Sequence, residues 1–222
     1  MKRLTDLATQ GCRISTGLLV SWEDRLCFAL SQPHYWEKSA DGSTIIHCIG
    51  IGGGLEEDEN FTQAVCREAV EEAQSPIRLI EPRREETLYW GPDQQLTWLK
   101  GGWADSTVSP LFLWQKEWVV RKPNQEPYMR RWFTPVYLAE FLNEPKPSME
   151  NLAIVQVPRK LFPELLKPMP LTKAKQKGLL IYGHDLPAEA ETMIGLSGSA
   201  FYTAQVWDTL FPKEGSDYQD DE

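Results

Sequence analysis

The stretch GGGLEEDENFTQAVCREAVEEAQSP, residues 52–76, constrains the fold more than any other part of the chain. Its three consecutive glycines let the backbone turn sharply and approach a ligand closely. Asn60 is a favourable N-cap, and Gln63 three residues later completes a capping-box pattern, so a helix should begin at about residue 61. Pro76 should end it, because the residue before a proline is pushed out of the helical region. The sequence therefore predicts a glycine-rich turn that leads directly into a helix.

The carboxylates of this predicted helix gather on one face. At about 100° per residue, Glu68, Glu71 and Glu72 lie close together on the helix surface. Like charges at such spacings cost roughly 0.2 to 0.5 kcal/mol per pair, and one guanidinium, that of Arg67, cannot neutralise three carboxylates. A separate arc is expected to face the core, and it consists of Cys66, Ala69, Val70 and Ala73.

Two interpretations of the acid face follow from these residues alone. A glutamate-rich helix face such as that of EAVEEA is typically a solvated surface. The other interpretation is a cation site, because Mg²⁺ takes oxygen ligands and is usually shared between one or two carboxylates and a substrate phosphate. The spacing of the residues around the helix favours the cation site.

That spacing resembles the Nudix box, Gly-x5-Glu-x7-Arg-Glu-U-x-Glu-Glu-x-Gly-U, where U is a bulky aliphatic residue. Six of the seven charged or glycine positions match, and they are Gly53, Glu59, Arg67, Glu68, Glu71 and Glu72. The chain departs from the pattern at the last glycine, which is Gln74, and at two U positions, which hold Ala69 and Ser75. The family glycine ends the helix in a left-handed conformation, so Pro76 is expected to end this helix by another route.

The resemblance implies a hydrolase that cleaves the pyrophosphate bond of a nucleoside diphosphate linked to another moiety, with Mg²⁺ or Mn²⁺ as cofactor. By position, the metal ligands would be Glu68, Glu71 and Glu72. Glu68 would be the general base, and Arg67 would orient the acids, so the catalytic set is Glu68, Arg67 and Glu71. The phosphate end would be shaped by Glu59 and by the backbone of Gly52, Gly53 and Gly54.

In some members of that family the general base lies in a later loop. The candidates here are Glu85, Glu86, Asp93 and Asp105. Pro92 lies near the position at which ADP-ribose-hydrolysing relatives are similar in carrying a proline, which favours a substrate of the ADP-ribose or nucleotide-sugar type. Three nearby tryptophans could stack on a base or belong to the core, and they are Trp90, Trp98 and Trp103. A second function stays open: a catalytically inactive Nudix-fold module that binds a nucleotide and regulates.

The composition limits the class of partner that the protein is expected to bind and its expected location. A net charge of -9 and a pI near 5.0 argue against a surface built for nucleic acid, which leaves a small nucleoside diphosphate derivative as the expected partner. The four cysteines form no CxxC pair and are expected to be reduced and mostly buried, while the three histidines receive no role. MKRLTDLATQ contains no apolar leader segment and no long apolar run follows, so no membrane association and a cytoplasmic location are expected. Homodimerisation stays open.

The order of elements predicts an α+β fold with a mixed β-sheet between helices and a C-terminal extension. The expected strands lie in 12–32 (a hairpin), 43–54, 77–90, 109–120, 132–142 and 177–183, and AIVQVPRKLFPELL, residues 153–166, is expected to form a strand and a short helix. Segment 91–110 is expected to be a long loop, and 188–211 to be helical. The expected division is a Nudix domain over 1–170, an extension packed on it over 171–211, and a disordered acidic tail over 212–222.

Overall fold

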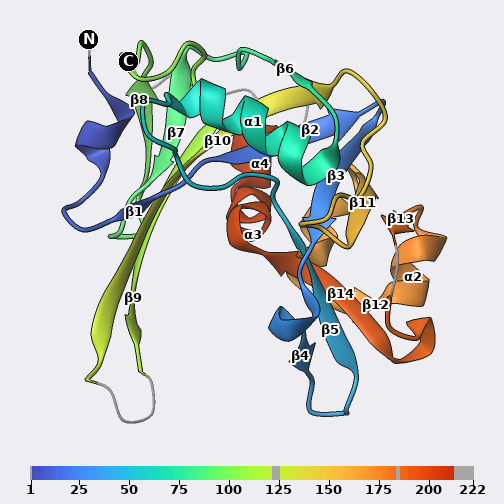
Figure 1. Cartoon of the computed structure of the whole chain (residues 1–222). Coiled ribbons are helices and arrows are strands. Elements are labelled where there is room, and N and C mark those ends of the chain that lie inside the picture. Colours follow the sequence, from blue (N-terminus) through green and yellow to red (C-terminus); the bar gives the residue numbers. More distant parts are fainter. Residues whose placement is uncertain (1, 122–125, 184–185, 213–222) are drawn as a thin grey trace.

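The protein is described from a computed structural model, which covers residues 2–121, 126–183 and 186–212. As expected, the fold is α+β: within these residues fourteen strands form one mixed sheet, flanked by a few helices (Figure 1). The main strand order is β12-β14-β5-β3-β2-β10-β9-β7-β8. No helix among the described residues is long and apolar enough to span a bilayer.

The strands have the following bounds: β1 Arg13–Ile14, β2 Gly17–Trp22, β3 Arg25–Leu30, β4 Glu37–Lys38, β5 Thr44–Ile49, β6 Ile77–Leu79, β7 Glu86–Trp90, β8 Leu96–Lys100, β9 Phe112–Val120, β10 Tyr128–Phe141, β11 Ala153–Pro158, β12 Met169–Pro170, β13 Leu180–Gly183 and β14 Thr192–Ser197. The α-helices are α1 Phe61–Ala73, α2 Leu171–Gln176, α3 Gly198–Gln205 and α4 Trp207–Leu210. Short 3-10 helices lie at Leu4–Leu7, Pro33–Tyr35, Phe162–Leu166 and Glu189–Glu191.

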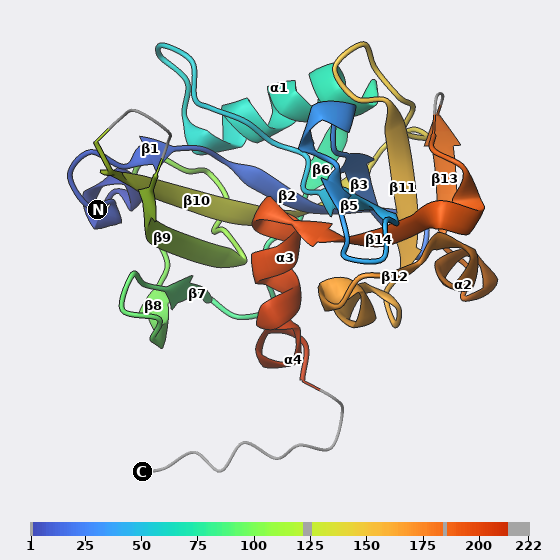
Figure 2. The ribbon, with the colours of Figure 1, turned by 90° about the horizontal axis from the view of Figure 1, so that it is seen from below.

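The sheet buries both of its faces, and successive residues of its central strands serve opposite cores. On β2, Leu18 and Val20 pack in the cluster that contains residues of α1, whereas Leu19 packs in the cluster that contains residues of α3. This follows from the period of two along a strand. Figure 2 shows α1 on one side of β2 and β10, with α3 and α4 on the other side. The central strands are therefore nearly continuous apolar runs, as a sheet covered on both faces requires.

The predicted hairpin near the N-terminus and the strand before the glycines are confirmed as β2, β3 and β5. The long loop expected over 91–110 is wrong, because it contains β8, which pairs with β7 as a hairpin. Gln94 makes the tight turn with a φ of 65°. The single strand expected over 77–90 is also wrong: β6 pairs with β10 and β7 pairs with β8 and β9.

The helix expected over 188–211 is correct only in its second part. The segment TMIGLS forms β14, which pairs in parallel with β5 from Thr192↔Thr44 to Ser197↔Ile49. Sheet pairing overrides helical tendency here, and Gly198, with a φ of 57°, turns the chain from strand into α3. The C-terminal segment thereby contributes a strand to the sheet next to β5. Residues 213–222 of the expected tail lie outside the described residues.

Helix α1 begins as predicted and ends differently. Asn60 accepts a hydrogen bond from the Gln63 amide at 2.9 Å, and the Gln63 side chain accepts from the Asn60 amide at 2.9 Å, which confirms the capping box. At the other end Gln74 itself takes the left-handed conformation, with a φ of 52°, and its side-chain amide donates to the Pro147 carbonyl. The expectation that Pro76 replaces this left-handed cap is therefore wrong. Gln74 adopts the conformation of the family glycine and anchors it with a side-chain hydrogen bond.

The core-facing arc of α1 also differs from the expected one. Ala69 and Ala73 are buried as predicted, but Cys66 and Val70 are exposed. Their place near the core is taken by Phe61 and Val65. All four cysteines are free: Cys27 and Cys48 are buried, Cys12 is partly buried and Cys66 is exposed.

Candidate functional site

Arg67, in the middle of α1, is the centre of a hydrogen-bonded network that joins the helix to the glycine turn. Its Nε and Nη2 donate to the two carboxylate oxygens of Glu59 at 2.8 and 3.0 Å. Nη1 donates to Glu68 Oε1 at 2.9 Å and to Glu71 Oε2 at 2.8 Å, while Nη2 also donates to the Gly54 carbonyl at 2.9 Å. One guanidinium therefore holds three carboxylates and the glycine turn together, which are the residues that the sequence spacing singled out.

The glycine turn packs tightly against the remaining acids. The Gly52 amide donates to Glu72 Oε2 at 2.9 Å. Gly52 has a φ of 143°, and a Cβ there would collide with the Thr16 carbonyl. A Cβ on Gly53 would collide with the Glu68 carboxylate. Glycine is required at Gly52, where the neighbouring atoms are backbone, whereas a side chain at Gly53 would force the Glu68 carboxylate to move.

Burial and charge set the ionisation of these carboxyl groups. Glu72 is largely removed from water, which raises its pKa to about 7 despite the hydrogen bond from Gly52. Burial also raises the pKa of Glu68, against the opposing effect of the Arg67 guanidinium. The hydrogen bonds from Arg67 instead hold the pKa of Glu59 below its usual range. The acids nearest the glycines therefore carry a burial cost that a bound cation would offset.

The donor set fits a hard divalent cation in chemistry. Glu68, Glu71 and Glu72 offer carboxylate oxygens, and Glu72 has no guanidinium or ammonium partner among the described residues. In the part of the chain that the structure describes, however, no three His, Cys, Asp or Glu side chains are arranged as a ready metal site. Arg67 occupies one oxygen each of Glu68 and Glu71, so binding of a cation would use their other oxygens.

A cavity of about 520 Å³ lies on the other side of the glycine turn. Gly52, Gly53 and Gly54 form part of its wall and also contact the acids or Arg67, whereas Glu68, Glu71 and Glu72 are not among its lining residues. The cavity opens between two projecting pairs of strands, β9–β10 and β4–β5, which Figure 1 shows extending away from α1. Ser197, Gly198 and Ser199, at the junction of β14 and α3, line it as well. We call this space the glycine-turn pocket.

The walls of the glycine-turn pocket carry residues to which the sequence assigned no role. The β9–β10 side contributes Trp114, Arg130, Trp132 and Thr134, and β1 contributes Arg13. The β4–β5 side contributes Glu37, His47 and Ile49, with Tyr35 preceding β4. The sequence predicted a strand over 132–142, but nothing in it indicated which face of that strand would meet the glycine turn.

The loop acids considered as general bases do not line the glycine-turn pocket. Asp105 accepts hydrogen bonds from the amides of Leu4 and Thr5 at 2.7 and 3.1 Å, so it anchors the N-terminal segment. Asp93 accepts from the Gln95 amide at 3.1 Å in the β7–β8 turn, which also contains Pro92.

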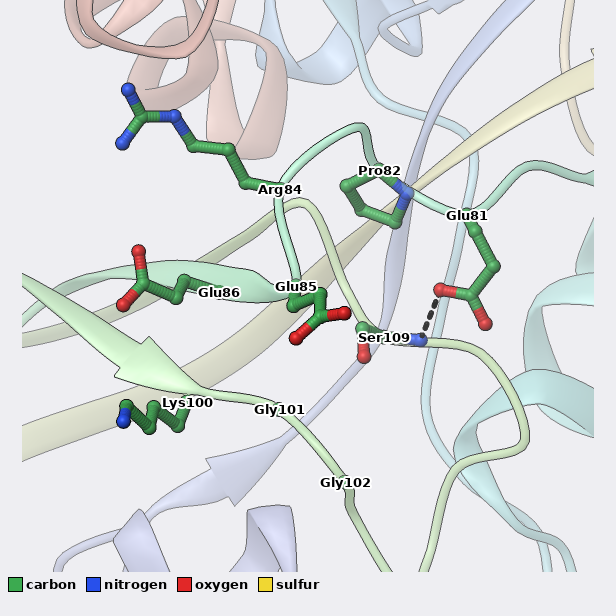
Figure 3. Close-up of a pocket in the computed structure, with 9 residues that line it drawn as sticks. All are labelled: Glu81, Pro82, Arg84, Glu85, Glu86, Lys100, Gly101, Gly102 and Ser109. Atoms are coloured by element: carbon green, nitrogen blue, oxygen red, sulfur yellow. Dashed lines mark hydrogen bonds between the residues drawn. The ribbon is translucent and has the colours of Figure 1, made fainter.

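Glu85 and Glu86 line a different and more open hollow of about 850 Å³, shown in Figure 3. It shares no lining residue with the glycine-turn pocket. Its charges are mixed: the glutamates lie with Arg84 and Lys100 around the ends of β7 and β8, and the Ser109 amide donates to Glu81 at 3.3 Å.

The three tryptophans proposed for base stacking have other surroundings. Trp103 is buried in the core beneath α1. Trp90 packs edge-on against Tyr202, with the Lys116 ammonium 4.3 Å from its ring centroid, and Trp98 lies 4.8 Å from the Arg84 guanidinium. None of them lines the glycine-turn pocket.

No protein-family model and no curated protein matches the chain. Solved structures match at low identity. A NUDIX hydrolase from Nitrosomonas europaea is 15% identical, with 68% of this chain and 60% of that chain covered and a TM-score of 0.37. The ORF135 protein of E. coli is 14% identical, with 92% and 94% covered and a TM-score of 0.44. A hydrolase of the NUDIX family from Clostridium perfringens is 13% identical, with 68% and 84% covered and a TM-score of 0.41. Likenesses this distant assign no activity to this chain.

Proposed function

We propose that the chain is a divalent-metal-dependent hydrolase of the Nudix type, which cleaves the pyrophosphate bond of a nucleoside diphosphate linked to another moiety. One observation carries the proposal: the residues that match the Nudix box are joined by hydrogen bonds from Arg67 and Gly52 beside a ligand-sized cavity. A solvated glutamate face would need neither the Arg67 network nor the close packing of Gly53 against Glu68.

The residues of the site would divide the work as follows. Glu68, Glu71 and Glu72 hold the Mg²⁺ or Mn²⁺ ion, which supplies charge stabilisation to the phosphates when bound. Arg67 positions Glu68 and Glu71 through its hydrogen bonds, and Glu59 in turn positions Arg67. The backbone of Gly52 to Gly54 would shape the phosphate end of the site, since these glycines form part of the pocket wall.

Glu68 is the proposed general base. Its burial raises its pKa, which makes its carboxylate a better proton acceptor than an exposed glutamate. In the proposed step Glu68 takes a proton from water, the water oxygen forms a bond to phosphorus, and the bond from that phosphorus to its leaving phosphate oxygen breaks. Arg67 keeps Glu68 ionised and oriented through the hydrogen bond at 2.9 Å.

The proposed substrate class is that of ADP-ribose and the nucleotide sugars. The support from Pro92 is weakened, because Pro92 lies in the β7–β8 turn and does not line the glycine-turn pocket. The support that remains is the cavity itself, which at about 520 Å³ has the size of a typical small-molecule site and holds aromatic and charged side chains.

Product release from a panel of compounds tests the proposal. The panel contains ADP-ribose, NADH, UDP-glucose, diadenosine tetraphosphate and ATP, each with Mg²⁺ or Mn²⁺ and with EDTA. Wild type is compared with Glu72→Gln, and Glu57→Gln is the control because Glu57 is exposed in the loop before α1 and, among the described residues, forms no ion pair with Arg67. We expect metal-dependent turnover in wild type and Glu57→Gln, and a loss of 100-fold or more in Glu72→Gln, of the order that charge stabilisation by one group supplies.

Turnover that survives both EDTA and Glu72→Gln would overturn the metal-dependent mechanism. Saturable binding without product, in folded protein with metal present, would instead identify the nucleotide-binding regulatory module. The finding that Gln74 keeps the left-handed helix end makes that second function less favoured, because the departure from the box leaves the acids undisturbed.

A further inference from the structure

Two arginines flank one tryptophan on a wall of the glycine-turn pocket. The guanidinium carbons of Arg13 and Arg130 lie 5.4 and 5.5 Å from the ring centroid of Trp132. The pairing register explains the arrangement: Arg13 lies beside Trp132 across β1 and β10, and Arg130 is two residues from Trp132 along β10. Residues two apart on a strand point to the same face, so all three belong to the pocket side of the sheet.

Neither arginine is neutralised within the protein. Among the described residues, Arg13 and Arg130 form no ion pair with a carboxylate, and both side chains are exposed. The neighbouring Arg131, on the opposite face of β10, donates from Nε to Glu117 at 3.0 Å. In a chain with a net charge of -9, acidic partners are abundant, and yet the two arginines that face the pocket have none.

The opposite wall carries little charge to balance them. One carboxylate, Glu37, is found among the described residues that line the pocket, and its Oε1 lies 3.6 Å from Nε2 of His47 on the same wall. The pocket therefore has a positive wall in a negative protein. Guanidinium groups without internal partners, held in place by an aromatic ring, are suited to a phosphate group of a ligand.

Along the strands, the backbone positions of both arginines are displaced from the glycine end of the wall. Ser15 pairs with Gly54 and shares a 2.7 Å hydrogen bond with Thr134, which marks the glycine end of the wall. At about 3.3 Å per residue, Arg13 is roughly 7 Å and Arg130 roughly 13 Å farther along the strands. A ligand that reaches both the glycine turn and Arg130 is longer than one diphosphate group.

We infer that Arg13 and Arg130 bind a further phosphate of the substrate, one that is separate from the diphosphate and lies on the nucleoside or on its linked moiety. The inference rests on the proposed function for the position of the diphosphate, and it narrows the substrate class to phosphorylated nucleoside diphosphate derivatives. Contacts with Trp132 hold both guanidinium carbons within 5.5 Å of one ring centroid, which places both cations near the same phosphate.

Matched ligand pairs that differ by one phosphate test the inference. NADPH and NADH differ at the ribose 2′ position, and coenzyme A and dephospho-coenzyme A differ at the 3′ position. Binding is measured by isothermal titration calorimetry in EDTA, so that the result does not depend on turnover. Wild type should bind the phosphorylated member of at least one pair about tenfold or more tightly, the difference expected from one charge-assisted contact.

Substitutions of the two arginines test whether they cause the preference for the phosphorylated ligand. Arg13→Gln and Arg130→Gln should each reduce the preference for the extra phosphate severalfold, with unfolding curves like that of wild type. Arg131→Gln is the matched control, since it removes the adjacent cation from the other face, and it should keep the preference. If either phosphorylated compound is hydrolysed, the arginine variants should raise its KM and leave kcat nearly unchanged.

The failures of the two proposals are distinguishable. Equal binding of both members of both pairs by wild type would overturn the inference, as would a preference that survives Arg13→Gln combined with Arg130→Gln. A preference that depends on the arginines, with no turnover of any compound, would leave the inference standing and count against the hydrolase. A structural role for the arginines would show as loss of stability with an unchanged preference, which also overturns the inference.

Discussion

The arginines on the two sides of the glycine turn differ in their burial and in their contacts. On the acid side, Arg67 is partly buried and donates to three carboxylates and a backbone carbonyl. On the pocket side, Arg13 and Arg130 are exposed and contact an indole ring instead of an acid. The turn itself belongs to both sides, since Gly52 and Gly54 bind the acid side and also line the pocket.

This difference in contacts distinguishes an arginine that positions other side chains from arginines that can bind a ligand. A cation whose donors are all used inside the protein can orient its partners but has little capacity left for a ligand. A cation with unused donors beside a cavity retains that capacity. Arg67 therefore belongs to the scaffold that holds the acids, while Arg13 and Arg130 are available to a substrate.

Replacing an arginine by glutamine should give the largest difference between the two sides, in both the free energy of unfolding and the rate of hydrolysis. Arg67→Gln would leave Glu59, Glu68 and Glu71 without their shared guanidinium, and we expect a loss of about 2 to 4 kcal/mol in the free energy of unfolding, because breaking a partly buried charge network leaves uncompensated charges. Hydrolysis should fall 100-fold or more, since the acids lose their orientation. Arg130→Gln should leave the free energy of unfolding within about 0.5 kcal/mol of wild type. Urea denaturation and turnover assays measure both, and equal stability of the two variants would break the comparison.

Gly53→Ala changes the turn that the two sides share. The new methyl group would collide with the Glu68 carboxylate, which Arg67 holds in place, so Glu68 must move. We expect turnover to fall by roughly 10- to 100-fold, with a smaller effect on stability. Gly54→Ala is the control, because its methyl group would meet no atom within 4 Å, and its loss of activity should be clearly smaller. Equal losses in the two variants would mean that the contact of Gly53 with Glu68 is unimportant.

Acidification should reduce the stability that the Arg67–Glu59 pair contributes on the acid side. Arg67 lowers the pKa of Glu59, so the native state binds fewer protons there than the unfolded state does. The stability from this pair is present above the ordinary glutamate pKa, about 4.3, and is lost as the pH falls through the lowered pKa. The difference in unfolding free energy between wild type and Glu59→Gln, measured by urea denaturation from pH 7 to 3, should therefore shrink on acidification. A difference in unfolding free energy that stays constant or grows on acidification would contradict this prediction.

The sequence predicted the acid side well and the pocket side hardly at all. The Asn60 cap, the helix that follows it and the spacing of Arg67 to its glutamates are local, since all the partners lie within about fifteen residues. The pocket wall depends on pairing between residues over a hundred positions apart, such as Arg13 with Trp132. No local pattern specifies such a pairing.

The strand β14 was missed for the same reason. TMIGLS has no strong preference of its own, and its conformation depends on pairing with β5, nearly 150 residues earlier in the chain. His47 received no role from the sequence, and the structure places it in the pocket wall opposite the arginines. Residues whose surroundings come from distant strands are therefore the ones that a single sequence cannot assign.

The smallest expected effect concerns the far end of α1, where local prediction also failed. The backbone of Gln74 is left-handed, a conformation that costs free energy for any residue other than glycine. The side-chain amide of Gln74 donates a hydrogen bond to the Pro147 carbonyl. Gln74→Ala and Gln74→Gly both remove the hydrogen bond, but only glycine also relieves the backbone. Gln74→Gly should therefore be about 1 kcal/mol more stable than Gln74→Ala in thermal or urea unfolding. Both variants should keep the turnover of wild type, because among the described residues the Gln74 side chain donates to the Pro147 carbonyl and not to Arg67 or the acids. Loss of turnover in Gln74→Gly would show that the C-terminal end of α1 helps to hold the acids. Gln74 would then belong, with Arg67, to the residues that position the acids.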